Sequence, residues 1–190
     1  AGIVDPQSRL FDKNLAGGAI LDVGLYPVSF SRLVAGASLG KNSINPHKIH
    51  GSAIIGKTGV DETAYASLYF ENSIVAKVET SIRKNMDNIG LIKGTNGSIL
   101  VTNLWQPGKE GGPYKSSIII KSEKENKKII LEGPEHLFFF EANLASKLII
   151  GNKREASPPA MTWEDTLGNL KVLDSWRKQI GYELSFDNIK

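Results

Sequence analysis

An aspartate and a tyrosine four positions apart, Asp22 and Tyr26, form the pair of side chains in this sequence best suited to catalysis. On a helix, residues four apart lie on the same face, one turn from each other. A carboxylate can orient a hydroxyl group and a phenol can exchange a proton, so together they make an acid/base pair. The alternative is structural, because a tyrosine hydroxyl bonded to a helix carboxylate also occurs without catalysis.

Glycines surround this pair. Gly17 and Gly18 precede it and allow another backbone or a flat ligand to approach closely. Gly24 lies between the two reactive residues, and a glycine inside a helix indicates a tight contact there. The segment from Gly17 to Tyr26 is therefore the candidate site.

A phosphate-binding pattern occurs in residues 51–58 (GSAIIGKT). A phosphate loop needs a strand before it and a helix that starts at its lysine and threonine. Here residues 52–55 have a strand-like pattern, and Gly59 leads into another strand. A strand followed by a glycine-flanked turn is favoured over a nucleotide-binding protein, which is the rival that this pattern raises.

Metal and thiol chemistry are not indicated. The histidines at positions 47 and 50 would point to opposite faces of a strand, and His136 is isolated. The sequence has no cysteine, which removes disulfides, thiolate metal sites and a cysteine nucleophile. We expect no metal site.

The charge balance does not favour nucleic acid, because 23 basic and 20 acidic residues give a net charge of only +3. The lysine-rich segment 121–128 contains two glutamates and no aromatic residue, so we expect a solvated hairpin tip. No apolar run reaches the roughly 20 residues that span a bilayer, and no signal-peptide pattern opens the chain. We expect a cytoplasmic protein with neither a nucleic-acid nor a membrane partner.

A helix over residues 17–36 is expected to carry the candidate pair, because its apolar residues form one stripe. Pro27 is expected to kink it into two shorter helices that meet near Tyr26. Gly36 is the expected stop. Two later helices are predicted over residues 135–150 and 163–180, the second capped by Thr162 with Asp165 three residues on.

Alternating patterns from about residue 48 to 131 predict strands. Residues 63–70 and 74–82 form one expected hairpin pair, and Asn96-Gly97 predicts a second hairpin turn. The third pair comprises residues 118–120 and 129–131. The predicted fold class is α+β, with a largely antiparallel open sheet and helices packed on one face, in one domain of 190 residues. The opposite face mixes aromatic and polar groups and suggests a homodimer, through Tyr65, Tyr69, Val75, Lys77 and Glu79.

The stretch from Arg9 to Gly36 (RLFDKNLAGGAILDVGLYPVSFSRLVAG) resembles the start of the C-terminal domain in the glucose-fructose oxidoreductase, inositol dehydrogenase and rhizopine-catabolism (Gfo/Idh/MocA) family. Later segments follow in the family's order, so the resemblance covers nearly the whole chain. These segments are residues 60–62 (VDE), 93–99 (KGTNGSI) and 159–165 (PAMTWED).

The resemblance implies that residues 1–190 are a single C-terminal domain for substrate binding and oligomerisation, as a homodimer or tetramer. An N-terminal Rossmann domain that binds NAD or NADP is expected upstream of Ala1, where the chain begins without a methionine. Tyr26 then matches the family's catalytic histidine or tyrosine and Asp22 its active-site aspartate, while Gly17 and Gly18 are expected to contact the cofactor.

The implied reaction is hydride transfer between nicotinamide and a carbinol carbon of a sugar, polyol or diol, with Tyr26 exchanging the hydroxyl proton and Asp22 orienting the substrate. Phenols ordinarily titrate near pH ~10, so such a base needs a nearby cation. The family's Glu-Lys-Pro motif, whose lysine supplies it, is absent here, so this chain alone is expected to be inactive. A non-catalytic carbohydrate-binding or assembly module of the same fold stays open on sequence alone.

Overall fold

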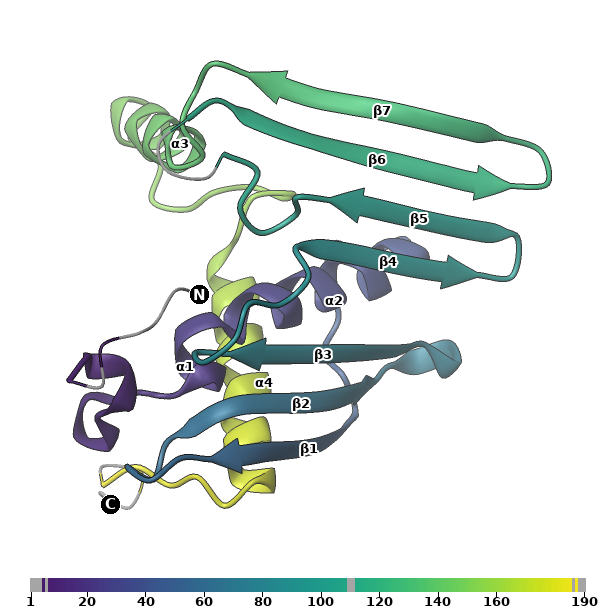
Figure 1. The fold of residues 1–190 in the computed structure, drawn as a ribbon. Coiled ribbons are helices and arrows are strands. Elements are labelled where there is room, and N and C mark those ends of the chain that lie inside the picture. The colour runs from purple at the N-terminus through teal and green to yellow at the C-terminus, as the bar shows by residue number, and fades with distance from the viewer. Residues whose placement is uncertain (1–4, 6, 109–111, 186, 188–190) are drawn as a thin grey trace. The chain divides into compact units, whose positions relative to one another are not determined.

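The computed structural model describes residue 5, residues 7–108 and 112–185, and residue 187. Residue contacts divide the chain into two units, one made of Ala1–Met86 with Ala156–Lys190 and the other of Asp87–Glu155. Each unit has its own antiparallel sheet (Figure 1).

The sheet of the larger unit has the strand order β1-β2-β3, and helices cover one of its faces (Figure 1). Helix α4 packs on β1, and α1 packs on β2 and β3. The strands are β1 (Lys48–Ile55), β2 (Asp61–Tyr69) and β3 (Val75–Ser81); the helices are α1 (Ala19–Val23), α2 (Leu25–Ser38) and α4 (Trp163–Gln179). Short 3-10 turns are η1 (Arg9–Phe11), η2 (Lys13–Leu15) and η3 (Glu71–Ser73).

The predicted alternation of β2 and β3 is confirmed by burial. Ala64, Ala66 and Leu68 of β2 are buried under the helices, while the residues between them face outward. Trp176 of α4 lies on this sheet, and its indole Nε1 donates to the carbonyl of Tyr65 at 3.1 Å. The indole fits there because β1 carries a glycine, Gly51, whose Cβ would lie 2.6 Å from the ring.

The expected helix over residues 17–36 is two helices, as predicted, and they meet at Gly24, two residues before the expected junction near Tyr26. Pro27 lies in the first turn of α2, where a backbone N–H has no partner within the helix and proline is tolerated. Helix α2 also runs two residues beyond Gly36, to Ser38. The capping box predicted between Thr162 and Asp165 is confirmed at the start of α4.

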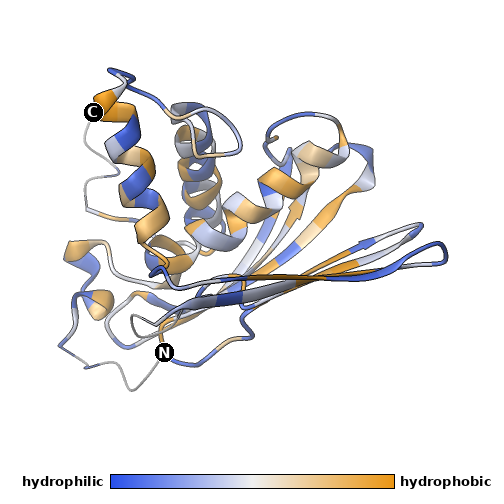
Figure 2. Cartoon of the chain, turned by 90° about the horizontal axis from the view of Figure 1, so that it is seen from above, coloured by the Kyte–Doolittle hydropathy of each residue, from blue (hydrophilic) through white to orange (hydrophobic). Residues whose placement is uncertain are grey.

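The sheet of the smaller unit has the order β4-β5-β6-β7. The hairpin at Asn96-Gly97 is confirmed. The predicted third hairpin is also present, but residues 118–120 pair with residues 127–129, and the ladder extends from the pair of Tyr114 with Gly133 to the pair of Lys121 with Asn126. The hydrophilic segment Lys121–Lys128 comprises the end of β6, the turn at residues 123–125 and the start of β7 (Figure 2). The elements are β4 (Ile89–Gly94), β5 (Gly97–Thr102), β6 (Tyr114–Ser122), β7 (Asn126–Gly133) and α3 (Phe139–Ile150).

The α+β class and the antiparallel pairing are thus confirmed, with the strands arranged in two sheets where the sequence suggested a single open one. Residues 82–88, between β3 and β4, form bends and irregular backbone rather than strand. The hydrogen-bonded ladder therefore stops at Ser81, and a new one begins at Ile89.

One described stretch, Lys13–Ser38, is long and apolar enough to cross a membrane by length and hydropathy alone. Ile20 and Val28 within it are fully buried in the core of the larger unit. A core helix passes the same test, and the packing of this stretch against the sheet accounts for its apolar composition.

Candidate active site

The turn before α1 is built on the two glycines. Gly17 and Gly18 are buried, and Gly18 has a φ of 104°, which side chains rarely adopt. Both N–H groups donate to backbone carbonyls of the preceding turns, at 3.0 and 2.9 Å. The Gly17 carbonyl accepts the Tyr182 hydroxyl at 2.9 Å, and the Gly18 carbonyl accepts the amide of Asp22 at 3.1 Å. All four polar groups of the pair are thus used inside the fold, and the predicted cofactor contact stays a prediction.

A buried carboxylate meets the start of α1. Asp61, at the beginning of β2, is 0% exposed, and its Oδ2 accepts the N–H of Ile20 at 2.7 Å. Any side chain at position 18 would collide with its Oδ1, so Gly18 is needed for this approach. Burial raises the pKa of Asp61 to about 6, and the hydrogen bond from Ile20 offsets part of that rise.

Asp22 lies in α1 and carries an ion pair. Nη2 of Arg9, in η1, donates to Oδ1 of Asp22 at 2.7 Å. The Arg9 side chain is 63% exposed and that of Asp22 is 21% exposed. One oxygen of the candidate carboxylate is thus held by a cation from an earlier turn.

Tyr26 lies in the first turn of α2 and is 53% exposed. Within the described residues its hydroxyl has no hydrogen-bond partner, and no direct hydrogen bond joins it to Asp22. The two helices meet at Gly24, whose N–H is shared between the carbonyls of Ala19 and Ile20 at 3.0 Å each. The structure therefore places both predicted catalytic residues at one helix junction, with the phenol accessible.

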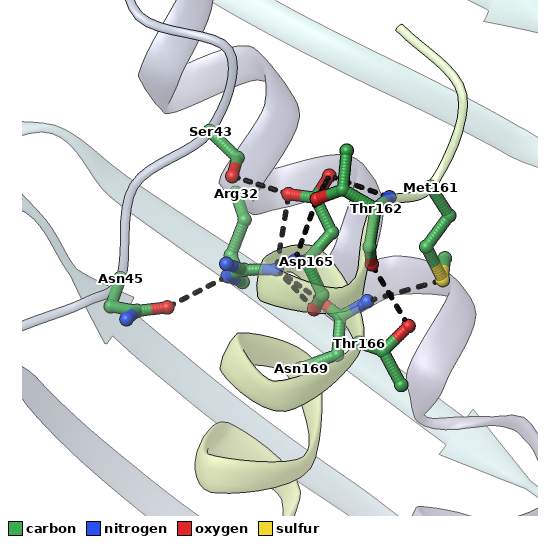
Figure 3. Close-up of polar contacts among 8 residues, drawn as sticks. All are labelled: Arg32, Ser43, Asn45, Met161, Thr162, Asp165, Thr166 and Asn169. Atoms are coloured by element: carbon green, nitrogen blue, oxygen red, sulfur yellow. Dashed lines mark hydrogen bonds and ion pairs between the residues drawn. The ribbon is translucent and has the colours of Figure 1, made fainter. Parts of the chain in front are cut away.

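The middle of α2 is held by a buried arginine, Arg32 (Figure 3). Arg32 is 3% exposed, and its Nη1 donates to the side chain of Asn169 at 2.7 Å and to the backbone carbonyl of Asp165 at 2.9 Å, both in α4. Its Nε donates to Asn45, before β1, at 2.9 Å. This network joins the helix that carries Tyr26 to the capping box of α4.

Metal ligands do not gather in the described residues: they contain no group of three or more histidine, aspartate or glutamate side chains arranged to hold an ion. The phosphate-loop letters at residues 51–58 lie on the end of β1 and the turn after it. No helix begins at Lys57 or Thr58, so the loop lacks the helix end that would bind phosphate.

Three residues of this region were missed from the sequence. Arg9 is thirteen positions from Asp22, and a charge at that spacing carries no helical signal. Asp61 was noted only within the three-residue segment 60–62. Tyr182 follows α4 and reaches Gly17 across 165 positions, a contact that only folding creates.

Comparison with known proteins identifies the class. Residues 2–100, more than half of the chain, match the family model described as the GFO/IDH/MocA C-terminal domain. The chain therefore belongs to the Gfo/Idh/MocA family, as its motifs predicted.

Its relatives include trans-1,2-dihydrobenzene-1,2-diol dehydrogenases. The enzyme of Mus musculus is 26% identical over 179 residues, which cover 91% of this chain and 49% of the relative. That of Homo sapiens is 32% identical over 103 residues, covering 52% of this chain and 28% of the relative. For relatives matched along nearly the whole chain, the chain spans about half of their length.

Solved structures share the fold. A 3-ketoreductase from Actinomadura kijaniata, in complex with NADP and TDP-benzene, has a TM-score of 0.73 at 18% identity, covering 94% of this chain and 51% of that one. An NAD-binding oxidoreductase from Klebsiella pneumoniae has a TM-score of 0.63 at 13% identity, covering 93% and 52%. At such identities the likeness establishes the fold of the domain.

Proposed function

We propose that this chain is the substrate-binding C-terminal domain of an NAD(P)-dependent oxidoreductase, with a dinucleotide-binding Rossmann domain encoded before Ala1. The observation that carries the proposal is the junction of α1 and α2, where Asp22 and the exposed phenol of Tyr26 lie in a chain of this family. The names of the relatives, which are dehydrogenases, support the reaction class.

In the proposed reaction, the bound nicotinamide supplies or accepts the hydride. Tyr26 exchanges the proton of the substrate hydroxyl, and Asp22 accepts a hydrogen bond from a neighbouring hydroxyl and so orients the substrate. We propose a sugar, polyol or diol as the substrate, since a carboxylate and a phenol at one junction match two adjacent hydroxyl groups. The Gly17-Gly18 turn would lie beside the cofactor.

Replacement of Tyr26 tests this function. In the full-length protein, Tyr26→Phe is expected to lower turnover about 100-fold or more, because it removes only the hydroxyl that carries the proton. Tyr114→Phe, on β6 of the smaller unit, is the matched control and is expected to leave turnover unchanged. A change of less than threefold in Tyr26→Phe would reject the assignment. NAD(P)-dependent turnover by the 190-residue chain alone would contradict the proposal that a separate domain binds the dinucleotide and this chain binds the substrate.

A second part of the proposal concerns assembly. The outward face of the β1-β2-β3 sheet holds an open hollow of about 510 Å³, lined by polar groups that include His50, Lys77 and Glu79. We propose that this face joins two copies of the chain. Light scattering at micromolar concentration is expected to give a dimeric or tetrameric mass, and Val75→Lys, at a position 48% exposed, is expected to reduce it. A monomeric mass for the unmodified protein would count against this interface.

A further inference from the structure

Asp61 owes its orientation to an irregularity in the sheet. Ile54 of β1 pairs with Thr63, but the next residue, Ile55, pairs with Asp61, so Glu62 is an extra residue in β2. Beyond such a bulge, side chains point to the opposite side of the sheet from the one that a regular strand would give them. Asp61 is thereby directed to the helix-covered side and is completely buried, while Glu62 forms a bidentate ion pair with Arg83, at 2.6 and 2.8 Å.

The contacts of Asp61 converge on the beginning of α1. Its Oδ2 accepts the Ile20 amide at 2.7 Å, and its Oδ1 lies against Gly18 without a hydrogen-bond partner in the described structure. The charged or titratable side chains that act on it are Arg177 of α4 and Tyr182, which follows α4. The carboxylate of Asp61 therefore lies between β2 and α1, the helix that carries Asp22.

Helix α1 has five residues, too few for a helix to be stable by its own hydrogen bonds. Its position therefore depends on tertiary contacts, and the bond from Ile20 to Asp61 joins its first turn to the sheet. Asp22 is two residues beyond Ile20, and Tyr26 is two residues beyond the junction at Gly24. A shift of Ile20 would move both proposed catalytic groups.

We infer that Asp61 is a positioning residue, which fixes α1 on β2 so that Asp22 and Tyr26 keep the geometry needed for proton exchange with substrate. This inference rests on the proposed function. An ionised carboxylate forms a shorter and stronger hydrogen bond to a backbone N–H than a neutral amide does. The bond is formed at an energetic cost, because burial of the charge disfavours the native state.

The test compares Asp61→Asn with Glu62→Gln in the full-length protein. Asparagine at position 61 keeps the size of the side chain and an acceptor for the Ile20 amide but removes the charge. Glu62→Gln is the control, because it removes a neighbouring carboxylate that pairs with Arg83 and not with α1. In Asp61→Asn, hydrogen exchange in the α1 peptide is expected to become about tenfold faster or more, and kcat to fall about tenfold. KM for the dinucleotide is expected to stay within threefold. Glu62→Gln is expected to change exchange in α1 and kcat by less than twofold.

The outcomes separate this inference from the proposed function. If Tyr26→Phe abolishes turnover while Asp61→Asn leaves kcat unchanged, the function stands and the positioning role is overturned. If neither variant affects turnover, the proposed site itself fails, and the positioning role fails with it. If Asp61→Asn does not fold, hydrogen exchange at the Ile20 amide is measured in the unmodified protein instead. Exchange as slow as in the core of α4 supports the inference. Exchange as fast as at the amide of Leu15 overturns it.

Discussion

The guanidinium of Arg9 lies 2.7 Å from Oδ1 of Asp22 and holds one oxygen of the proposed substrate-orienting carboxylate. The contact joins a 3-10 turn that precedes the glycine pair to the helix that follows it. Among the described residues Oδ2 of Asp22 accepts no side-chain hydrogen bond, so we expect the proposed hydrogen bond from a substrate hydroxyl to be made to Oδ2. Arg9 restricts the rotation of Asp22 and so fixes the direction of that oxygen.

Asp22→Asn separates the catalytic from the structural value of this carboxylate. Hydrogen bonds to charged groups contribute about 1.5–3 kcal/mol, so kcat/KM of the full-length protein is expected to fall about tenfold or more. Stability is expected to change by less than about 1 kcal/mol, because the ion pair is largely exposed on its arginine side. Steady-state kinetics and urea unfolding measure the two effects. The control is Glu71→Gln, which removes an exposed ion pair with Lys41. If kcat/KM of Asp22→Asn stays within twofold of the value for the unmodified protein, Asp22 does not contact the substrate.

Gly18→Ala is expected to be strongly destabilising, since the added methyl group meets Asp61 and the backbone keeps a positive φ. Gly40→Ala is the matched control, because Gly40 also has a positive φ, of 69°, but has no atom within 4 Å of the added Cβ. The free energy of unfolding is expected to fall by about 2 kcal/mol more in Gly18→Ala than in Gly40→Ala, because position 18 adds a steric clash and a backbone conformation that alanine adopts less readily than that of position 40. If urea unfolding shows equal losses of stability in the two variants, the side chain of Asp61 moves away from the added methyl group at little energetic cost.

Asp61 predicts an unusual dependence of stability on pH. Its pKa is about 6 in the folded protein against 3.8 as the ordinary value, so between pH 4 and 6 the folded state binds more protons than the unfolded state. The contribution of this group to stability therefore decreases as pH rises through that window, by about 3 kcal/mol in all. Asp61→Asn is expected to remove the effect, so that the variant gains stability relative to the unmodified protein from pH 4 to pH 7. A difference between the two proteins that is constant with pH would contradict the raised pKa.

Arg32→Ala is expected to lower the free energy of unfolding by about 3–5 kcal/mol, because it leaves the buried acceptor of Asn169 unpaired and removes the hydrogen bonds to Asn45 and to the carbonyl of Asp165. Urea unfolding measures this loss. Lys171→Ala, at an exposed position of α4, is the control and is expected to stay within about 0.5 kcal/mol. A loss below 1 kcal/mol in Arg32→Ala would show that the network does not hold α2 on α4.

The sequence by itself determined the features that arise from short-range order. Alternation of apolar residues predicted the strands and the buried face of β2, and the Thr162–Asp165 capping box predicted the start of α4. These predictions succeed because side-chain periodicity and capping bonds involve residues a few positions apart.

Only the tertiary structure decided which distant groups meet the site. Alternation continued backward from Ala64 would have directed Asp61 away from the helices, and the bulge at Glu62 reverses that direction. The ion pair of Arg9 with Asp22 and the bond from Tyr182 to Gly17 likewise join segments whose separation along the chain gives no periodic signal. The break at Gly24 lies within one turn of Pro27, whose ring and missing N–H prevent the helical hydrogen bond to the carbonyl of Val23, the last residue of α1.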